Sequence, residues 1–337
     1  GRGGINPASL AGMGPASGHL SVKGLPGAMS GDADLRIGPG VVGGEPFEEI
    51  TARATFSGAE VNVANLDARF RAGRVTANGS YNLETNQFDL NARGDDVRLD
   101  LITSLAGGSR NLPALSGLAE VTATARGNLL DTRSYRVELN AEGRDVAVNG
   151  RPAGALTLTG RTTDDEKFNL ELTTGLLGQP QVIRAQVDLS DEDLPVTIST
   201  TLTGSDLTQL FAALLPASNV RVTGRATGTL NASGNIFGDE GLLGEAGLGA
   251  LRGRAEFSDL VVQIEDVRLA AESPMIVQFS PNEIVFERTR FTGPGTNILF
   301  GGTAALGEGG RQNLTVDGEL NLRVLNGISP DVFLSGV

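Results

Sequence analysis

The stretch "VNVANLDARFRAGRVTANG" (residues 61–79) decides the fold, because apolar and polar residues alternate through most of it. Leu66 and Phe70 lie on one side of an extended strand, and charged residues stand between them on the other side. The phase of the alternation slips near Ala64–Asn65, which indicates a β-bulge or a turn, and Ala72–Gly73 is the next turn candidate. The stretch therefore predicts strands with one polar and one apolar face. The apolar face needs a cover, because exposing it to water costs about 25 cal/mol per Å².

The same alternation recurs along most of the chain. Residues 118–126 alternate small apolar residues with Glu, Thr and Arg, and residues 135–140 and 168–173 alternate larger ones. The segments between such strands are short and rich in Gly, Asn, Asp and Pro, which are typical turn residues. Strands joined by tight turns form an antiparallel meander.

Composition and charge limit the class of protein. The chain has 337 residues, which by length indicates two or three domains, and its 39% hydrophobic content is enough for a packed core. Cysteine and tryptophan are absent, aromatic residues make up 4%, and the net charge is −13. This charge argues against a nucleic-acid partner and against electrostatic docking of the chain on anionic lipid headgroups. The sequence has no apolar run of about 18 residues, no signal peptide and no initial Met, so we expect a middle fragment of a longer protein.

Helical patterns are scarce. The spacing of leucines predicts a helix over 205–216 and a shorter one over 99–107, with Asp206 and Asp100 as the capping residues. A third helix is predicted over 320–330. The helix near 207–215 either lies across the sheet as a lid or closes a sheet edge.

These three helices divide the chain into a long repeat. Each is followed by a Ser-Gly or Thr-Gly pair that opens, or is placed to open, a new alternating strand, and the copies are about 100–110 residues apart. The predicted units are 1–107, 108–216 and 217–337, with a Gly-rich linker at 238–250 in the third unit.

So few helices leave three ways to cover the apolar face: a second sheet in a sandwich or barrel, a solenoid core, or an open curled sheet covered by something other than protein. Sandwich cores usually contain large aromatic anchors, whereas the inward residues here are mostly Val, Leu, Ala, Thr and Gly. We therefore expect an all-β protein: an elongated, curled antiparallel sheet that forms an open hydrophobic groove, with a few short helices.

Five segments carry a resemblance to a known family: "FSGAEVNVANLDARFRAGRVTANGSYNL" (56–83), "DLTQLFAALLP" (206–216), "VTGRATGTL" (222–230), "LRGRAEFSDLVVQIED" (251–266) and "NEIVFERTRFTGPGTNILFGGTAAL" (282–306). They resemble the middle part of TamB-type translocation and assembly module proteins, in the AsmA-like, bridge-like lipid-transfer group. The resemblance covers nearly the whole chain.

The resemblance implies a long β-groove that crosses the periplasm of a diderm bacterium from an inner-membrane anchor to the outer membrane. It implies phospholipid as the cargo, and a role beside an outer-membrane barrel protein through regions outside this chain. If the apolar face is such a groove, the apolar positions of the alternating strands are the candidates for its lining: Val61, Leu66, Phe70, Phe88, Leu90, Val121, Tyr135, Val137, Leu139, Leu156, Leu158, Phe168, Leu170, Leu172, Ile198, Ile284, Phe286, Ile298, Phe300, Leu320 and Leu322.

Catalytic and metal-binding patterns are lacking. His19 is the only histidine and has no partner nearby in sequence, so a surface position is expected. The glycine-rich segment 247–253 does not have the spacing of a phosphate-binding loop, and the acidic turns 163–166 and 190–193 do not have calcium-loop spacing. We expect no enzyme activity, no metal and no cofactor. The rival interpretations are a secreted adhesive β-solenoid, an enzyme on a β-scaffold, and a scaffold for outer-membrane protein assembly.

Overall fold

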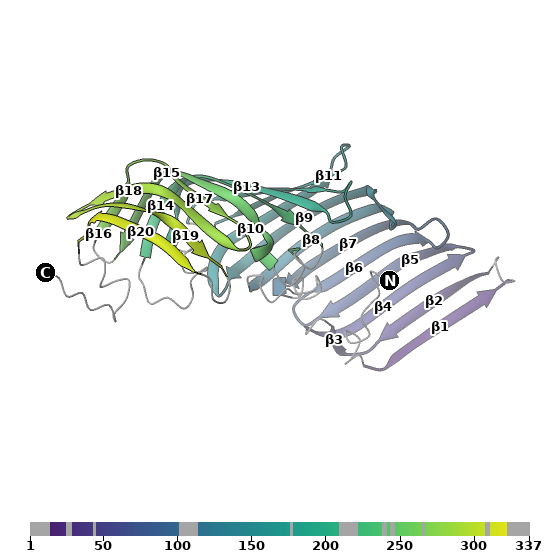
Figure 1. Cartoon of the computed structure of the whole chain (residues 1–337). Helices are drawn as coiled ribbons and strands as arrows, with labels where there is room; N and C mark the ends of the chain where they lie inside the picture. Colours follow the sequence, from purple (N-terminus) through teal and green to yellow (C-terminus); the bar gives the residue numbers. More distant parts are fainter. Residues whose placement is uncertain are drawn as a thin grey trace.

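The computed structural model describes residues 14–24, 29–42, 45–100, 114–175, 178–208, 222–237, 241–242, 247–264, 267–306 and 311–321. These residues form one long, curved antiparallel sheet of 20 strands (Figure 1). The prediction of an elongated, curled, all-β fold is confirmed.

The strands follow one another along the chain. In the first part they are β1 (Ala16–Lys23), β2 (Ser30–Ile37), β3 (Gly40–Val42), β4 (Glu45–Ser57), β5 (Glu60–Phe70), β6 (Arg74–Asn82) and β7 (Gln87–Arg98). In the middle they are β8 (Leu115–Asn128), β9 (Asp131–Val148), β10 (Arg151–Thr162), β11 (Lys167–Thr174), β12 (Gln181–Asp188) and β13 (Pro195–Asp206). In the last part they are β14 (Val222–Asn235), β15 (Arg252–Ile264), β16 (Val267–Ala271), β17 (Met275–Phe279), β18 (Glu283–Gly293), β19 (Thr296–Ala305) and β20 (Gln312–Glu319).

Apart from β2 with β3 and β16 with β17, consecutive strands pair antiparallel, as a meander requires. Two positions in the sheet are split between consecutive strands. β2 and β3 both pair with β4, while β16 and β17 both pair with β15 and with β18. A parallel-coil solenoid is therefore excluded. Within the described ranges β1 and β20 are not paired with each other, so the sheet is open, and no second sheet covers it.

The opening stretch folds as predicted. Residues 61–70 belong to the single strand β5, and the register against β6 shifts between Val63 and Leu66. The slip at Ala64–Asn65 is thus a bulge and not a turn. The chain reverses at residues 71–73 before β6 begins.

Bulges recur in a row along the sheet. The strands β5, β7, β9, β13, β15 and β18 each carry one extra residue relative to the strand that follows or precedes them. All six run in the same direction, because an even number of strand positions separates each from the next. A bulge bends its strand and increases the local twist. Bulges distributed over so many strands add to the curvature of the sheet.

Two of the three long connections between strands, 99–114 and 207–221, fall at a regular interval in the sheet, and the third, 236–251 between β14 and β15, leaves the opposite edge. Six strand positions, with β2–β3 counted as one, precede the connection 99–114 between β7 and β8. Six more, β8 to β13, precede the connection 207–221, and β14 to β20 make a further six with β16–β17 counted as one. Because six is even, both long connections leave the same rim of the sheet, which we call the long-connection rim. The opposite edge, with the turns 83–86, 129–130, 163–166 and 189–194, is the hairpin rim.

The sheet runs across both expected unit boundaries, since β7 pairs with β8 and β13 pairs with β14. The division into three units remains a prediction. Within the linker 238–250, Gly247–Ala250 forms the short 3-10 helix η2, and residues 238–240 and 243–246 lie outside the described residues.

The predicted helices are described only at their first residues. Leu207 and Thr208 are helical, and Asp206 caps them, because its Oδ1 accepts a hydrogen bond of 2.8 Å from the Thr208 N–H. Asp100 is itself helical and its carboxylate pairs with Arg98, so its predicted role as a cap stays a prediction. The remainder of both helices, and the predicted helix 320–330 beyond residue 321, lie outside the described residues.

Candidate functional site: the apolar face of the sheet

The pairing register carries one apolar face across the sheet, because residues directly opposite in antiparallel strands point to the same side. In the first part of the chain Val61 is opposite Tyr81, which in turn is opposite Phe88. In the middle, Phe168 is opposite Val187, which in turn is opposite Val196. Side chains of this kind succeed one another from β1 to β20.

The predicted lining residues lie together on this face. The register places the following there: Val61, Leu66, Phe70, Phe88, Leu90, Val121, Tyr135, Val137, Leu139, Leu156, Leu158, Phe168, Leu170, Leu172, Ile198, Ile284, Phe286, Ile298 and Phe300. Leu320 follows β20 and packs against the apolar cluster of the last strands. Leu322 lies outside the described residues.

Sequence reasoning missed further members of the face. Phe257 and Leu260 are three residues apart, so strict alternation puts them on opposite sides, but the extra residue in β15 returns both to the apolar side. They are opposite Gly228 and Ala226 of β14. Ile183 and Val187 of β12 also belong to the face, and their alternation with Arg184 and Gln186 was a sufficient signal.

The apolar residues form three packed clusters. One lies near the long-connection rim and contains Leu99, Ala119, Val146 and Ala153. A second lies at the hairpin rim and contains Val187, Leu189 and Val196. The third spans β13 to β19. Between and beyond them the side chains are half-buried, and Leu20 on β1 and Val316 on β20 are exposed at the two edges.

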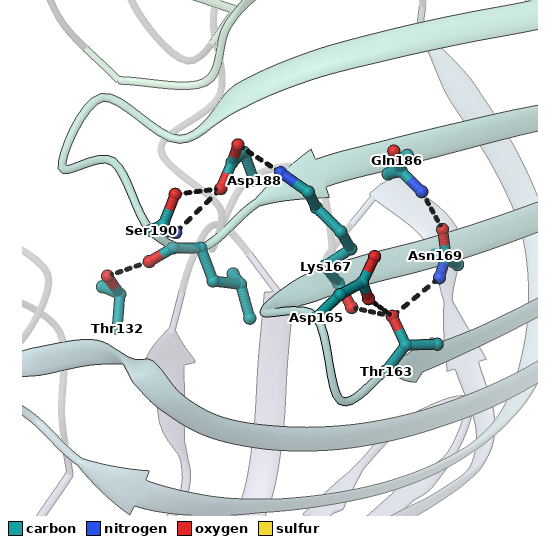
Figure 2. Close-up of polar contacts among 9 residues, drawn as sticks. Thr132, Thr163, Asp165, Lys167, Asn169, Gln186, Asp188 and Ser190 are labelled. Atoms are coloured by element: carbon teal, nitrogen blue, oxygen red, sulfur yellow. Dashed lines mark hydrogen bonds and ion pairs between the residues drawn. The ribbon is translucent and has the colours of Figure 1, made fainter.

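The sheet curls toward its apolar face at the hairpin rim. Thr132 Oγ1, at the start of β9, donates a 2.6 Å hydrogen bond to the Leu189 carbonyl after β12 (Figure 2). In a flat sheet strands three positions apart are roughly 14 Å from each other. Tyr135 of β9 also packs against the cluster around Val187 and Leu189. These contacts pass over the β10–β11 hairpin on its apolar side, so this side is concave there.

Aromatic rings of the apolar face lie over glycines. Phe88 and Tyr135 meet edge to face with centroids 5.5 Å apart, although β8 stands between their strands. The strand between them presents Gly127, where a Cβ would approach the Tyr135 ring to 2.9 Å. Likewise a Cβ on Gly160 would come within 2.8 Å of the Phe168 ring. The rings therefore occupy space that side chains of β8 and β10 would otherwise fill. At Gly127 and Gly160 no side chain of these two strands projects from the apolar face.

Three threonine hydroxyl groups on this face are bonded to the backbone. Thr162 Oγ1 accepts from the Val137 N–H at 3.0 Å, and Thr200 Oγ1 donates to the Val182 carbonyl at 2.9 Å. Thr174 Oγ1 donates to the Ala153 carbonyl at 3.3 Å. Their methyl groups, and not their hydroxyls, are thus left to contact whatever covers the face. One polar atom there is buried without a partner, Gln181 Oε1.

The opposite face is charged and paired. Arg74 binds Asp67 through two nitrogens, and its hydrogen bond to the carboxylate lowers the pKa of Asp67. Lys167 binds Asp188, and this hydrogen bond, together with those from Ser190, lowers the pKa of Asp188 to about 2 (Figure 2).

Shallow hollows open on the polar face between these long side chains. One of about 710 Å³ lies over β9 to β13. Its lining carries acids and bases in balance, among them Glu138 and Arg161, while Arg184 pairs with Glu171 at 3.0 Å.

The structure brings together no reactive group among the described residues. His19 is exposed on the polar side of β1, opposite Asp34. No group of three or more His, Cys, Asp or Glu in the described ranges is placed to hold a metal ion. What the arrangement offers chemically is a continuous apolar surface bounded by charge.

No helix in the described part of the chain is long and apolar enough to cross a membrane. Comparisons with protein-family models, with curated proteins and with solved structures found no match to this chain.

Proposed function

We propose that the chain is a non-enzymatic conduit along which phospholipid moves with its acyl chains on the apolar face of the sheet. The observation that carries this proposal is the run of apolar side chains from β1 to β20 on one curved face that no second layer of the described residues covers. Hydrocarbon chains fit such a face, because they remove its apolar area from water and have no hydrogen-bonding groups that must be paired.

The dimensions support acyl chains as the occupant. Most strands have 8 to 14 residues, which corresponds to roughly 27–48 Å along the strand. This width is sufficient for an acyl chain, with its headgroup in water at a rim. Eighteen strand positions at about 4.8 Å extend the track to the order of 85 Å.

The floor of the face favours sliding over fixed binding. Small residues such as Ala123 and Ala125, and the positions Gly127 and Gly160 that have no side chain, give it little relief. A lipid on such a surface gains similar apolar contact at each step, so no one position holds it strongly.

The resemblance to TamB-type proteins supports the setting. We place the chain in the periplasm of a diderm bacterium, as part of a bridge between the inner and outer membranes, with phospholipid as the cargo. A contact with an outer-membrane barrel protein, and a role in assembling such proteins, follow from the same resemblance and belong to regions outside this chain.

Site-specific crosslinking tests the proposal. A photoreactive side chain at Phe88 or Phe168, on the apolar face, is expected to label phospholipid in cells and in the purified protein. The same group at Arg69 of β5 or at Glu171 of β11, on the polar face of the sheet, is the control and is expected to give little labelling. Equal labelling from both faces, or purified protein free of lipid by mass spectrometry, would contradict the proposal.

A further inference from the structure

The tip of the β8–β9 hairpin exposes two adjacent leucines. Leu129 is 52% exposed and Leu130 is 81% exposed. Leu83, at the tip of the neighbouring β6–β7 hairpin, is 60% exposed. These three residues form what we call the leucine tip, which stands on the hairpin rim.

The leucine tip is held in place by hydrogen bonds between the two hairpins. The Leu129 N–H donates to the Asn86 carbonyl at 2.9 Å, and Asn128 Nδ2 donates to the Thr85 carbonyl at 2.8 Å. The Leu83 N–H donates to the Ala59 carbonyl at 2.8 Å, which ties the pair to the β4–β5 turn. The backbone therefore holds these apolar side chains in water, and a stable exposed patch of this kind is typical of a docking surface.

Three arginines stand behind the tip. Arg126 of β8 and Arg136 of β9 are directly opposite each other, an arrangement of like charges that is destabilising. Arg133 lies between Arg136 and the tip, and its carbonyl accepts a 3.1 Å hydrogen bond from Arg136 Nη1. A hollow of about 580 Å³ opens beside Arg126 and Arg136, and Glu60 and Asp89 also line it.

The three arginines form no ion pair with the acids near them in the described part of the chain. Asp89 is opposite Arg126 in the sheet, and Asp131 lies at the tip, yet among the described residues neither forms an ion pair with the three arginines. Elsewhere in the sheet, arginines such as Arg74 and Arg184 are paired across strands. An unpaired cluster of like charge is complementary to an anion.

We propose that the β8–β9 hairpin docks on the surface of an anionic phospholipid layer, with the leucine tip in the acyl region and the three arginines on the phosphate groups. Arg126 and Arg136 are about 12 Å from the tip along their strands. Interfacial apolar groups enter a bilayer by roughly 5–10 Å, and arginine side chains reach back toward the headgroups, so both parts engage together.

The docking is local, because the net charge of −13 repels an anionic surface. At physiological salt, charges more than about 8 Å away are largely screened, so the arginine cluster governs the interaction at contact. The charge argument from the sequence concerns the whole chain and does not apply at this hairpin.

Tryptophan fluorescence gives a direct test, because the chain has no tryptophan. Leu130→Trp is expected to show a blue-shifted emission on addition of phosphatidylglycerol–phosphatidylethanolamine vesicles, and quenching by brominated acyl chains. Binding to pure phosphatidylcholine vesicles, measured by the same shift at the same lipid concentration, should be at least tenfold weaker.

Charge substitutions test the arginines. In the Leu130→Trp background, Arg126→Gln, Arg133→Gln and Arg136→Gln together are expected to weaken vesicle binding at least tenfold, since each basic group near an anionic surface contributes roughly fivefold. Arg74→Gln with Arg184→Gln, which removes paired arginines elsewhere on the polar face, is the matched control and is expected to leave binding unchanged. Circular dichroism and the melting temperature check that each variant is folded.

Three outcomes would overturn the inference: no blue shift with any vesicle, equal binding to neutral and anionic vesicles, or retention on polyglutamate with none on vesicles, which would assign the cluster to an acidic protein partner. The inference does not rest on the proposed conduit. Leu129→Asn with Leu130→Asn should abolish docking and leave co-purified lipid unchanged, so failure of docking and failure of the conduit are distinguishable.

Discussion

At the scale of the residue, the apolar face depends on where side chains are missing as much as on where they are large. Gly160 lies under the Phe168 ring and the Leu170 side chain, and Gly127 lies beside Tyr135. A ring that covers a glycine on the adjacent strand packs against backbone and protects it from water. The face is therefore apolar although it has no side chain at these glycine positions.

Gly160→Ala tests this packing. The new Cβ would meet Phe168 Cζ at 2.8 Å and Leu170 Cδ2 at 2.9 Å, so both side chains must move away from the sheet. We expect a loss of about 1–3 kcal/mol in the free energy of unfolding, as for other overpacked sites, measured by urea denaturation. Gly249→Ala is the control, because nothing lies within 4 Å of its added Cβ, and it should change stability by less than about 0.5 kcal/mol. An unchanged stability of Gly160→Ala would show that the ring does not rest on the glycine.

At the scale of the element, the ends of the hairpins are joined by polar contacts that hold the curl. The turn after β12 is bonded to the start of β9 through Thr132, and to β11 through the Lys167–Asp188 pair (Figure 2). Ser190, in the same turn, donates both its N–H and its hydroxyl to Asp188 Oδ1. One carboxylate thus organises the turn that closes this part of the hairpin rim.

The pH dependence of stability follows from this carboxylate. The pKa of Asp188 is about 2 in the folded chain, below its ordinary value of 3.8, so the ionised form stabilises the fold above pH 4. This stabilisation is lost as pH falls from about 4 to about 2. We expect Asp188→Asn to melt below the wild type at neutral pH, with a difference that shrinks over that interval.

A second variant tests which hydrogen-bond donor lowers the pKa of Asp188. Lys167→Gln removes the donor with the largest effect, so the pKa of Asp188 should rise toward the ordinary value in a carboxyl ¹³C titration. A pKa that stays near 2 in this variant would assign the shift to Ser190 instead.

At the scale of the whole molecule, a single curved sheet carries an apolar face that is longer than any one packed cluster. The described residues cover it only in part, in three clusters, and the edge strands β1 and β20 present exposed apolar side chains. Edge strands with unpaired backbone groups tend to associate. Both the uncovered part of the apolar face and the edge strands therefore favour self-association of the chain.

Removal of lipid is therefore expected to change the assembly state. After extraction with detergent and its removal, the chain should self-associate and bind a hydrophobic dye, because the apolar area must find another cover. Added phospholipid should restore the monomer, as measured by light scattering coupled to size-exclusion chromatography. A lipid-free chain that remains monomeric and does not bind the dye would show that its apolar face is already satisfied by protein.

The sequence by itself determined the local structure and the identity of the apolar face. Alternation with period two in 61–79 gave the strands, the slip at Ala64–Asn65 gave a bulge as one of two interpretations, and short turns gave the antiparallel meander. These features depend on residues close together in the chain, so they can be predicted without tertiary contacts.

Only the tertiary structure decided how the strands combine. The positions of the bulges, the return of Phe257 and Leu260 to one face, and the contact of Thr132 with Leu189 all depend on register between strands. Register is set by pairing across the whole sheet, and a shift of one residue reverses every side chain that follows. Alternation therefore predicts that a strand has two faces, whereas pairing with its neighbours decides which residues share a face and toward which side the sheet curls.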